Sequence, residues 1–199
     1  MAYDPEAKRA RILKAAAEEL TAYGPAGARV DRIAAAARVN KQGIYHYFGD
    51  KQALLAEVLR QRLDDLAEAV ELHPERVADY AGALFDFHLE HPDVIRLVLW
   101  EALAADNGLV VSESLRHDHY QDKVDAVIAA QREGGVDESL DPRLAVLAIL
   151  SLVNWQFAAT QVARHVLAAD GGHPTPTTDE RRAFAVEAAR RLVTPAPPA

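Results

Sequence analysis

Cysteine is absent from the 199 residues, which excludes a disulfide framework, a thiolate metal site and a cysteine nucleophile. A glycine-rich phosphate loop and a G-x-S-x-G turn, two signatures of common enzyme classes, are also missing. The longest apolar run, residues 144–153, contains Ser151 and is far shorter than the ~20 residues of a membrane-spanning helix. The first dozen residues carry charges and no apolar segment, unlike a secretory signal. We therefore expect a cytoplasmic protein that crosses no membrane, catalyses no reaction and needs no cofactor.

Strand-like alternation and internal repeats are not found either, and half of the residues are apolar, enough for a sizeable core. The apolar side chains recur at the spacing of amphipathic helices, and Gly and Pro separate the segments. We predict an all-α protein of about nine helices, at residues 5–23, 30–37, 41–48, 51–72, 74–91, 92–105, 112–133, 142–169 and 179–193.

Residues 30–51, VDRIAAAARVNKQGIYHYFGDK, contain the most informative pattern in the chain. The spacing i, i+3, i+4, i+7 predicts one apolar helix face formed by Val30, Ile33, Ala34 and Ala37. Asn40 is suited to cap a second helix, because its side-chain oxygen accepts a backbone N–H of the first turn. Ile44 and Phe48 lie four apart and are expected to point inward. The pattern therefore predicts a helix-turn-helix whose second helix presents polar and aromatic side chains to a DNA major groove.

This stretch resembles the DNA-binding segment of the TetR family of bacterial transcriptional regulators, which typically reads I-A-x-x-A-G-V-S-K-x-T-x-Y-x-Y-F-x-x-K-x-x-L. The resemblance covers about the first quarter of the chain, and the residues that carry it are Ile33, Ala34, Ala37, Arg38, Val39, Asn40, Lys41, Gly43, Tyr45, Tyr47, Phe48, Lys51 and Leu54. Three positions depart from the family pattern. Arg29 stands where the first helix often has a Ser or Thr cap, Arg38 where the turn often has Gly, and Gly43 where a hydroxyl often contacts phosphate.

The resemblance implies a three-helix DNA-binding domain at residues 1–50 and a regulatory and dimerisation domain at residues 51–193. The remaining residues, 194–199, read TPAPPA and are expected to form a disordered tail. The charge distribution agrees with this division. Residues 1–50 carry a formal charge of +2 and the other residues carry −10, which together give the −8 of the whole chain. A mildly basic segment on an acidic body fits a protein that offers one end to a polyanion.

Six residues of this stretch are expected to contact DNA. Base-edge contacts are assigned to Lys41, Gln42 and His46, because these helix positions face away from the protein. Gln pairs with adenine and Lys donates to guanine in the major groove. Phosphate contacts are assigned to Tyr45, Tyr47 and Lys51, because tyrosine hydroxyls end rigid rings and a lysine beside a helix N-terminus favours phosphate. Packing within the small domain is the alternative role for both tyrosines.

The segment 142–169 bears on assembly, because its start, RLAVLAILSLV, is apolar on more sides than a surface helix of a monomer needs. In the resembled family the last two helices pair with their copies across a twofold axis. The resemblance therefore implies a homodimer whose interface contains Leu147, Leu150, Val153, Phe157, Phe184 and Leu192. Burial within a single chain is the alternative. A symmetric dimer predicts a pseudo-palindromic operator with half-sites ~34–36 Å apart.

The resemblance also implies an apolar effector pocket with a few polar groups in the regulatory domain. The candidate lining residues are His88, Trp100, Glu101, His117, Tyr120 and Asn154. Ordinary core packing is the alternative for Trp100, and a buried interface amide is the alternative for Asn154. Metal binding by the histidine pairs 88/91 and 117/119 is disfavoured, because neither pair has an acidic or thiolate partner in a known motif.

These observations favour a DNA-binding transcriptional regulator, and within that class a repressor that a largely apolar small molecule releases from a double-stranded DNA operator. Activation in place of repression stays open, because the sign of regulation depends on where the operator lies relative to the promoter. Two alternative functions also remain. One is an architectural or co-regulatory helical DNA-binding protein without a small-molecule ligand, whose core would be filled and whose affinity would follow salt alone. The other is a ligand-binding module whose DNA contacts have decayed, against which the intact Tyr45, Tyr47 and Lys51 argue.

Overall fold

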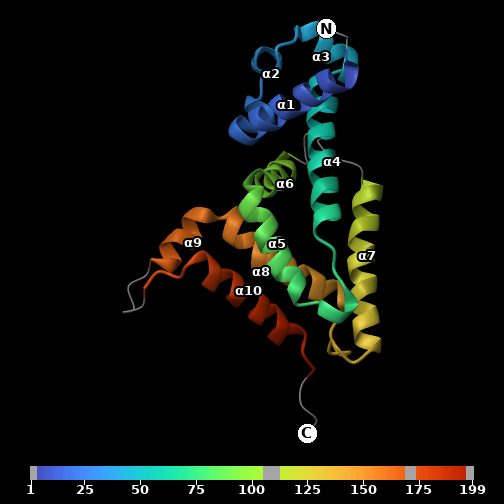
Figure 1. Ribbon diagram of the computed structural model, residues 1–199, viewed down its shortest axis with the longest axis vertical. Helices are drawn as coiled ribbons and strands as arrows, with labels where there is room; N and C mark the ends of the chain where they lie inside the picture. The colour runs from blue at the N-terminus through green and yellow to red at the C-terminus, as the bar shows by residue number, and fades with distance from the viewer. Residues whose placement is uncertain (1–3, 105–112, 169–173, 196–199) are drawn as a thin grey trace. The chain divides into compact units, whose positions relative to one another are not determined.

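The computed structural model describes residues 4–104, 113–168 and 174–195, and within these ranges the protein is helical without any strand (Figure 1). The all-α fold expected from the sequence is confirmed. The described elements are α1 (Pro5–Gly27), α2 (Val30–Ala37), α3 (Lys41–Phe48), α4 (Lys51–Ala69), the 3₁₀ turn η1 (Pro74–Arg76), α5 (Asp79–Glu90), α6 (Pro92–Ala104), α7 (Glu113–Arg132), α8 (Pro142–Ala158), α9 (Thr160–Leu167) and α10 (Thr178–Val193). Of the expected tail at residues 194–199, residues 196–199 lie outside the described part.

The helices form two compact units, each with its own apolar core. The first unit comprises the described residues of 1–65 and 96–113. Its core is built from side chains of α1 to α4 with one contribution from α6, including Ile12, Ile33, Ile44, Leu55 and Leu97. The second unit comprises the described residues of 66–95 and 114–199. The chain passes from the first unit into the second within α4, between Asp65 and Leu66.

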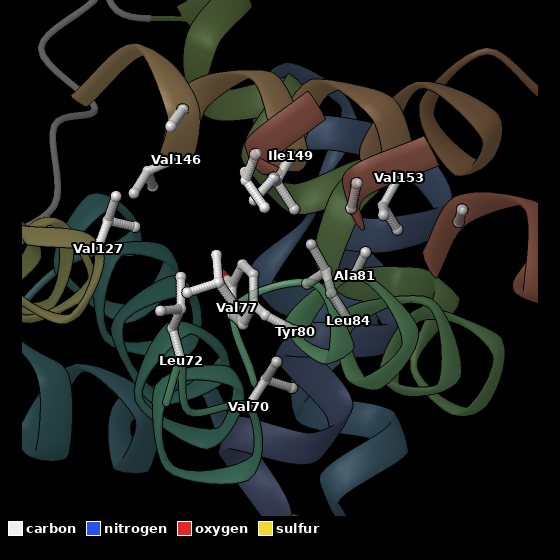
Figure 2. Close-up of a cluster of buried hydrophobic side chains, with 14 of the residues drawn as sticks. Val70, Leu72, Val77, Tyr80, Ala81, Leu84, Val127, Val146, Ile149 and Val153 are labelled. Atoms are coloured by element: carbon white, nitrogen blue, oxygen red, sulfur yellow. The ribbon is translucent and has the colours of Figure 1, made fainter. Parts of the chain in front are cut away.

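The core of the second unit lies between α5, α7, α8 and α10. Figure 2 shows side chains of α8 pointing toward side chains of α5, with Ile149 and Val153 on one side and Ala81 and Leu84 on the other. An ion pair joins α10 to α5, because Arg182 Nε donates to Asp86 Oδ1 at 2.7 Å. Both α8 and α10 are thus packed against α5.

Capping residues that are readable in the sequence mark several of the helix starts. Asp4 accepts a hydrogen bond from Ala7 N at 3.1 Å, and Pro5 follows at the first helical position. Asp141 and Pro142 repeat this arrangement at α8. At α10 the cap is Thr177, whose hydroxyl accepts from the backbone N–H of Glu180 while the Glu180 carboxylate accepts from Thr177 N.

Two segments differ from the nine-helix expectation. The segment 142–169 is divided at Ala159, whose backbone leaves helical geometry (φ −113°, ψ 57°), and the described residues consequently contain ten α-helices. The axes of α8 and α9 differ by 87°. The segment 74–91 begins with a 3₁₀ turn, and its α-helix starts only at Asp79. In the described ranges no single helix is long and apolar enough to cross a membrane, and α8 with α9 meets that criterion only as a bent pair.

Candidate functional site

The predicted helix-turn-helix is formed by α2 and α3, and its inward residues are those that the spacing indicated. The apolar face of α2 is buried at Val30, Ile33, Ala34 and Ala37. Ile44 anchors α3 and is fully buried, while Phe48 is half-buried. Asn40 caps α3, because its Oδ1 accepts from Gly43 N at 2.7 Å. Both helices therefore stand on the core of the first unit with defined faces.

The turn between α2 and α3 has a left-handed residue that is not glycine. Arg38 ends α2 with φ 55° and ψ 47°, and the described part of the chain contains no other non-glycine residue at positive φ. Backbone hydrogen bonds hold this turn closed, from Arg38 N to Ala35 O and from Val39 N to Ala34 O. An L-residue in this conformation costs free energy because Cβ crowds the following carbonyl oxygen. The Arg38 side chain is exposed, so nothing in the core requires it.

The start of α2 is capped from a distance by Glu19, a role that the sequence reasoning did not assign. Arg29 is the N-cap residue and makes no side-chain capping bond. Instead the Glu19 carboxylate of α1 accepts the backbone N–H of Arg29 at 2.8 Å and Arg32 Nε at 2.8 Å. Burial raises the pKa of Glu19, but the hydrogen bonds from Arg32 and Arg29 outweigh it and hold the pKa below its ordinary value. The sequence signal was an acidic residue on the otherwise buried face of α1.

The outward face of α3 carries four exposed side chains, namely Lys41, Gln42, Tyr45 and His46. The three residues expected to contact bases belong to this set. Lys41 Nζ lies 2.9 Å from Asp31 Oδ1 of α2, and this hydrogen bond raises the pKa of Lys41. Because both side chains are largely exposed, Lys41 can readily exchange Asp31 for another anion.

The other expected phosphate contacts, Tyr47 and Lys51, are half-buried. The Tyr47 ring packs edge-on against His46 at 5.7 Å and lies 5.6 Å from Lys8 Nζ. Packing is thus part of the role of Tyr47, as the alternative interpretation proposed. Lys51 is the first residue of α4, next to Asp50, whose carboxylate accepts from Ala53 N at 2.8 Å.

Among the expected pocket residues, the structure joins His88 of α5 to Asn154 of α8. His88 Nε2 lies 2.9 Å from Asn154 Oδ1, and His88 is only 2% exposed. Because an amide oxygen only accepts, Nε2 carries the proton and Nδ1 is an acceptor. Nδ1 is buried and has no hydrogen-bond partner among the described residues. Burial lowers the pKa of His88 below its ordinary value of 6.5, against the opposite effect of the Asn154 bond.

The remaining pocket candidates lie elsewhere. Trp100 and Glu101 are on α6 in the first unit, where Glu101 is buried. A Cβ at position 24 would come within 2.9 Å of the Trp100 ring, so the ring packs against the glycine at the kink of α1. His117 and Tyr120 are on α7 in the second unit and are exposed.

Two open clefts in the second unit have charged side chains among their lining residues. One, of about 330 Å³, includes Glu68, Asp122 and Lys123, and the other, of about 450 Å³, includes Arg76 and Asp79. None of the expected pocket residues lines either cleft. Burial lowers the pKa of Lys123 despite its acidic neighbours Asp122 and Glu71. Within the described ranges, no group of three or more His, Asp or Glu side chains is arranged to hold a metal ion.

The expected dimer residues fall into three classes of exposure. Leu147, Phe184 and Leu192 are exposed, and Phe184 reaches 65%. Leu150 and Phe157 are half-buried, and the Phe157 ring packs edge-on against Phe85 at 5.0 Å. Val153 is instead fully buried in the core of the second unit, where a second chain has no access to it. Two exposed residues of α8, Leu144 and Trp155, were not assigned from the sequence, although they share a helix face with Leu147.

Comparisons with known proteins extend the helix-turn-helix resemblance to the whole chain. The family model of bacterial regulatory proteins of the tetR family matches residues 12–58, and the model of the tetracyclin repressor-like C-terminal domain matches residues 76–191. The HTH-type transcriptional repressor SCO4008 of Streptomyces coelicolor is 38% identical over 192 residues, covering 96% of this chain and 98% of that protein. The chain belongs to the TetR family.

A further relative and two solved structures are consistent with this family. The HTH-type transcriptional regulator RutR of Escherichia coli is 29% identical over 72% of this chain and 70% of its own. A crystal structure of a transcriptional regulator of Streptomyces coelicolor, SCO4942, superposes with a TM-score of 0.81 at 34% identity, covering 94% of this chain and 98% of that one. A TetR-family structure from Mesorhizobium loti, 18% identical with a TM-score of 0.68 and covering 97% and 100% of the two chains, supports the fold alone. The protein is thus a DNA-binding transcriptional regulator, as the helix-turn-helix predicted.

Proposed function

We propose that this TetR-family regulator is a dimeric repressor that binds a pseudo-palindromic operator and is released from it by a small molecule. The observation that carries the proposal is that one side of α3 is buried while the other side is exposed. Ile44 is fully buried, whereas Lys41, Gln42, Tyr45 and His46 are exposed on one side. A short helix anchored in this way presents hydrogen-bonding side chains to base edges in a major groove.

Within this proposal the DNA contacts are divided by chemistry. Lys41, Gln42 and His46 read base edges, because each offers a donor or acceptor from the outward face. Tyr45, Tyr47 and Lys51 contact phosphates and fix the register of α3 in the groove. The functional DNA-binding domain is residues 1–50, and residues 51–193 form the regulatory and dimerisation domain. The match of the tetR-family model at residues 12–58 supports a DNA-binding domain at the start of the chain, although the first compact unit also includes the described residues of 51–65 and 96–113.

The proposed dimer interface is the apolar surface of α8 and α10. Leu147 and Trp155 of α8, with Phe184 and Leu192 of α10, are large apolar side chains left exposed in the single chain. Because α10 packs on α8, both helices take part in one surface. Leu150 and Phe157 flank it as half-buried residues. A twofold axis through this surface places two copies of α3 for two operator half-sites.

The proposed effector site is centred on the His88–Asn154 pair. An unpaired acceptor in an apolar surrounding is costly, and a hydrogen-bond donor from a largely apolar ligand removes that cost. Phe87 and Phe157 provide aromatic surface beside His88, with ring centres 6.0 Å and 5.4 Å away. By linkage, effector and operator must weaken each other's binding to the same degree.

Selection of bound duplexes from a random DNA pool by the purified protein tests the proposal. A dimeric repressor enriches a twofold-symmetric sequence with half-sites separated by about one helical turn, ~34–36 Å. Enrichment of nothing, together with binding that depends on salt alone, contradicts the proposal and favours an architectural role. The name repressor carried by the relative with 38% identity supports the former outcome.

A further inference from the structure

Lys8 of α1 lies against one side of α3. Its Nζ is 5.6 Å from the centre of the Tyr47 ring, and it would be 3.3 Å from a Cβ built at position 43. Positions 43 and 47 are one helical turn apart and therefore share a side of α3. The ammonium group of Lys8 thus occupies the side of α3 on which Gly43 has no side chain of its own.

Gly43 leaves room for this close approach. It is the third residue of α3, in the first turn of the helix, and it has no Cβ to fill the space beside Lys8. A Cβ at this position would meet Lys8 Nζ at 3.3 Å and the capping atom Asn40 Oδ1 at 2.9 Å. Without that Cβ the lysine and the cap fit together. The positive charge that lies beside position 43 of α3 is therefore that of Lys8, which belongs to α1.

The position of the Lys8 ammonium group relative to the outward face of α3 indicates which part of the DNA it can contact. An α-helix with its side chains is about 10–12 Å across and nearly fills a major groove about 12 Å wide. When Gln42 and His46 face the base edges, positions 43 and 47, next to them around the helix, face one wall of the groove. That wall is the phosphate backbone, whose charge a compact, flexible ammonium group complements without base preference.

We propose that Lys8 contacts an operator phosphate beside α3, in place of a side chain that Gly43 does not have. This inference rests on the proposed function, since it requires that α3 enters a major groove. It assigns a DNA contact to α1, a helix that otherwise contributes to the core of the first unit and caps α2 through Glu19. Tyr47 acquires a further role, because its ring positions the Lys8 ammonium group.

The test compares Lys8→Ala, Lys8→Arg and the control Lys14→Ala in the full chain. Lys14 is an exposed lysine of the same helix. The affinity of each protein for the duplex selected by the unmodified protein is measured over a salt series, and thermal unfolding confirms that each variant is folded. Lys8→Ala should flatten the plot of log affinity against log salt by about 0.9 per bound protomer. Lys8→Arg and Lys14→Ala should retain the slope of the unmodified protein.

The outcomes separate this inference from the proposed function. If the unmodified protein binds its selected duplex and folded Lys8→Ala has the same slope, the Lys8 contact is refuted while the repressor proposal stands. Weaker binding by Lys8→Ala at an unchanged slope also refutes it, because the lysine would then act only through Tyr47. Failure of the unmodified protein to select any duplex overturns both.

Discussion

Glu19 and Arg29 are ten residues apart, yet the carboxylate of Glu19 accepts the backbone N–H of Arg29 at 2.8 Å. This bond gives α2 the N-terminal cap that the Arg29 side chain does not supply. The same carboxylate accepts Arg32 Nε, so one buried acidic group fixes both the start and the orientation of α2 against α1. The first helix of the DNA-binding motif thus depends on α1 for its placement.

Replacing Glu19 by Gln should reduce the free energy of unfolding by about 1–3 kcal/mol, because the hydrogen bonds lose a charged acceptor in a buried place. The folded pKa of Glu19 lies below its ordinary value of 4.5. Its stabilising contribution is therefore complete above that value and is lost as the pH falls through the folded pKa. Urea denaturation at several acidic pH values measures both effects. Glu18→Gln, at the exposed neighbouring position, is the control and should change neither.

Replacing Arg38 by Gly should raise the stability of the protein by about 0.5–1 kcal/mol, because glycine adopts the left-handed conformation without the Cβ penalty. Arg38→Ala is the matched control, since it removes the same guanidinium group and keeps a Cβ. Chemical denaturation of the two variants compares them directly. Equal stability of the glycine and alanine variants would show that the turn is not strained at Arg38.

The buried His88 should make stability depend on pH near neutrality. Its folded pKa is lower than 6.5, so the unfolded chain binds the proton more readily. Stability is therefore complete above 6.5 and falls as the pH drops from there toward the folded pKa. His88→Gln should remove this part of the pH dependence, whereas the exposed His165→Gln should leave it intact. Urea denaturation midpoints measured above and below pH 6.5 test this prediction. Identical pH dependence of stability in the two variants would contradict it.

Much of this architecture was predictable because its determinants are local. The caps at Asp4, Asn40 and Asp141 and the spacing of apolar residues in α2 describe contacts within a few positions of the chain. The cap supplied by Glu19 was not predictable in this way, because it joins two helices whose packing had to be known first. The break at Ala159 carries no Gly or Pro to announce it.

The candidate sites divide along the same line. Exposure of Lys41, Gln42 and His46 follows from the helical period and the position of Ile44. The dimer surface does not follow so simply, because an apolar helix such as α8 has faces toward its own core and toward a partner. Periodicity alone did not separate the buried Val153 from the exposed Trp155, which are two residues apart. That separation depends on where α5 and α10 pack on α8.

Two substitutions in the DNA-binding motif should have different signatures. Gln42→Ala should weaken binding to the selected operator by about 1–3 kcal/mol and relax preference at particular base pairs, because a base-edge contact is lost. Lys51→Ala should weaken binding to all duplexes alike and flatten the salt slope by about one unit per protomer. Competition assays with operator and random duplexes distinguish the two. Equal loss of operator and random binding in Gln42→Ala would remove it from the base-reading set.

Replacing Phe184 by Glu should convert the proposed dimer into monomers at micromolar concentration. Phe184 is 65% exposed in the single chain, so the substitution disturbs little within one protomer. Across a twofold interface, however, it buries two carboxylates without partners, which is strongly unfavourable. Sedimentation velocity measures the assembly state, and operator binding should become weaker and steeper in protein concentration because two monomers must now meet on the DNA. Leu89→Glu, at an exposed leucine of α5, is the control and should sediment as the unmodified protein does. A Phe184→Glu protein that still sediments as a dimer would place the interface outside the surface of α8 and α10.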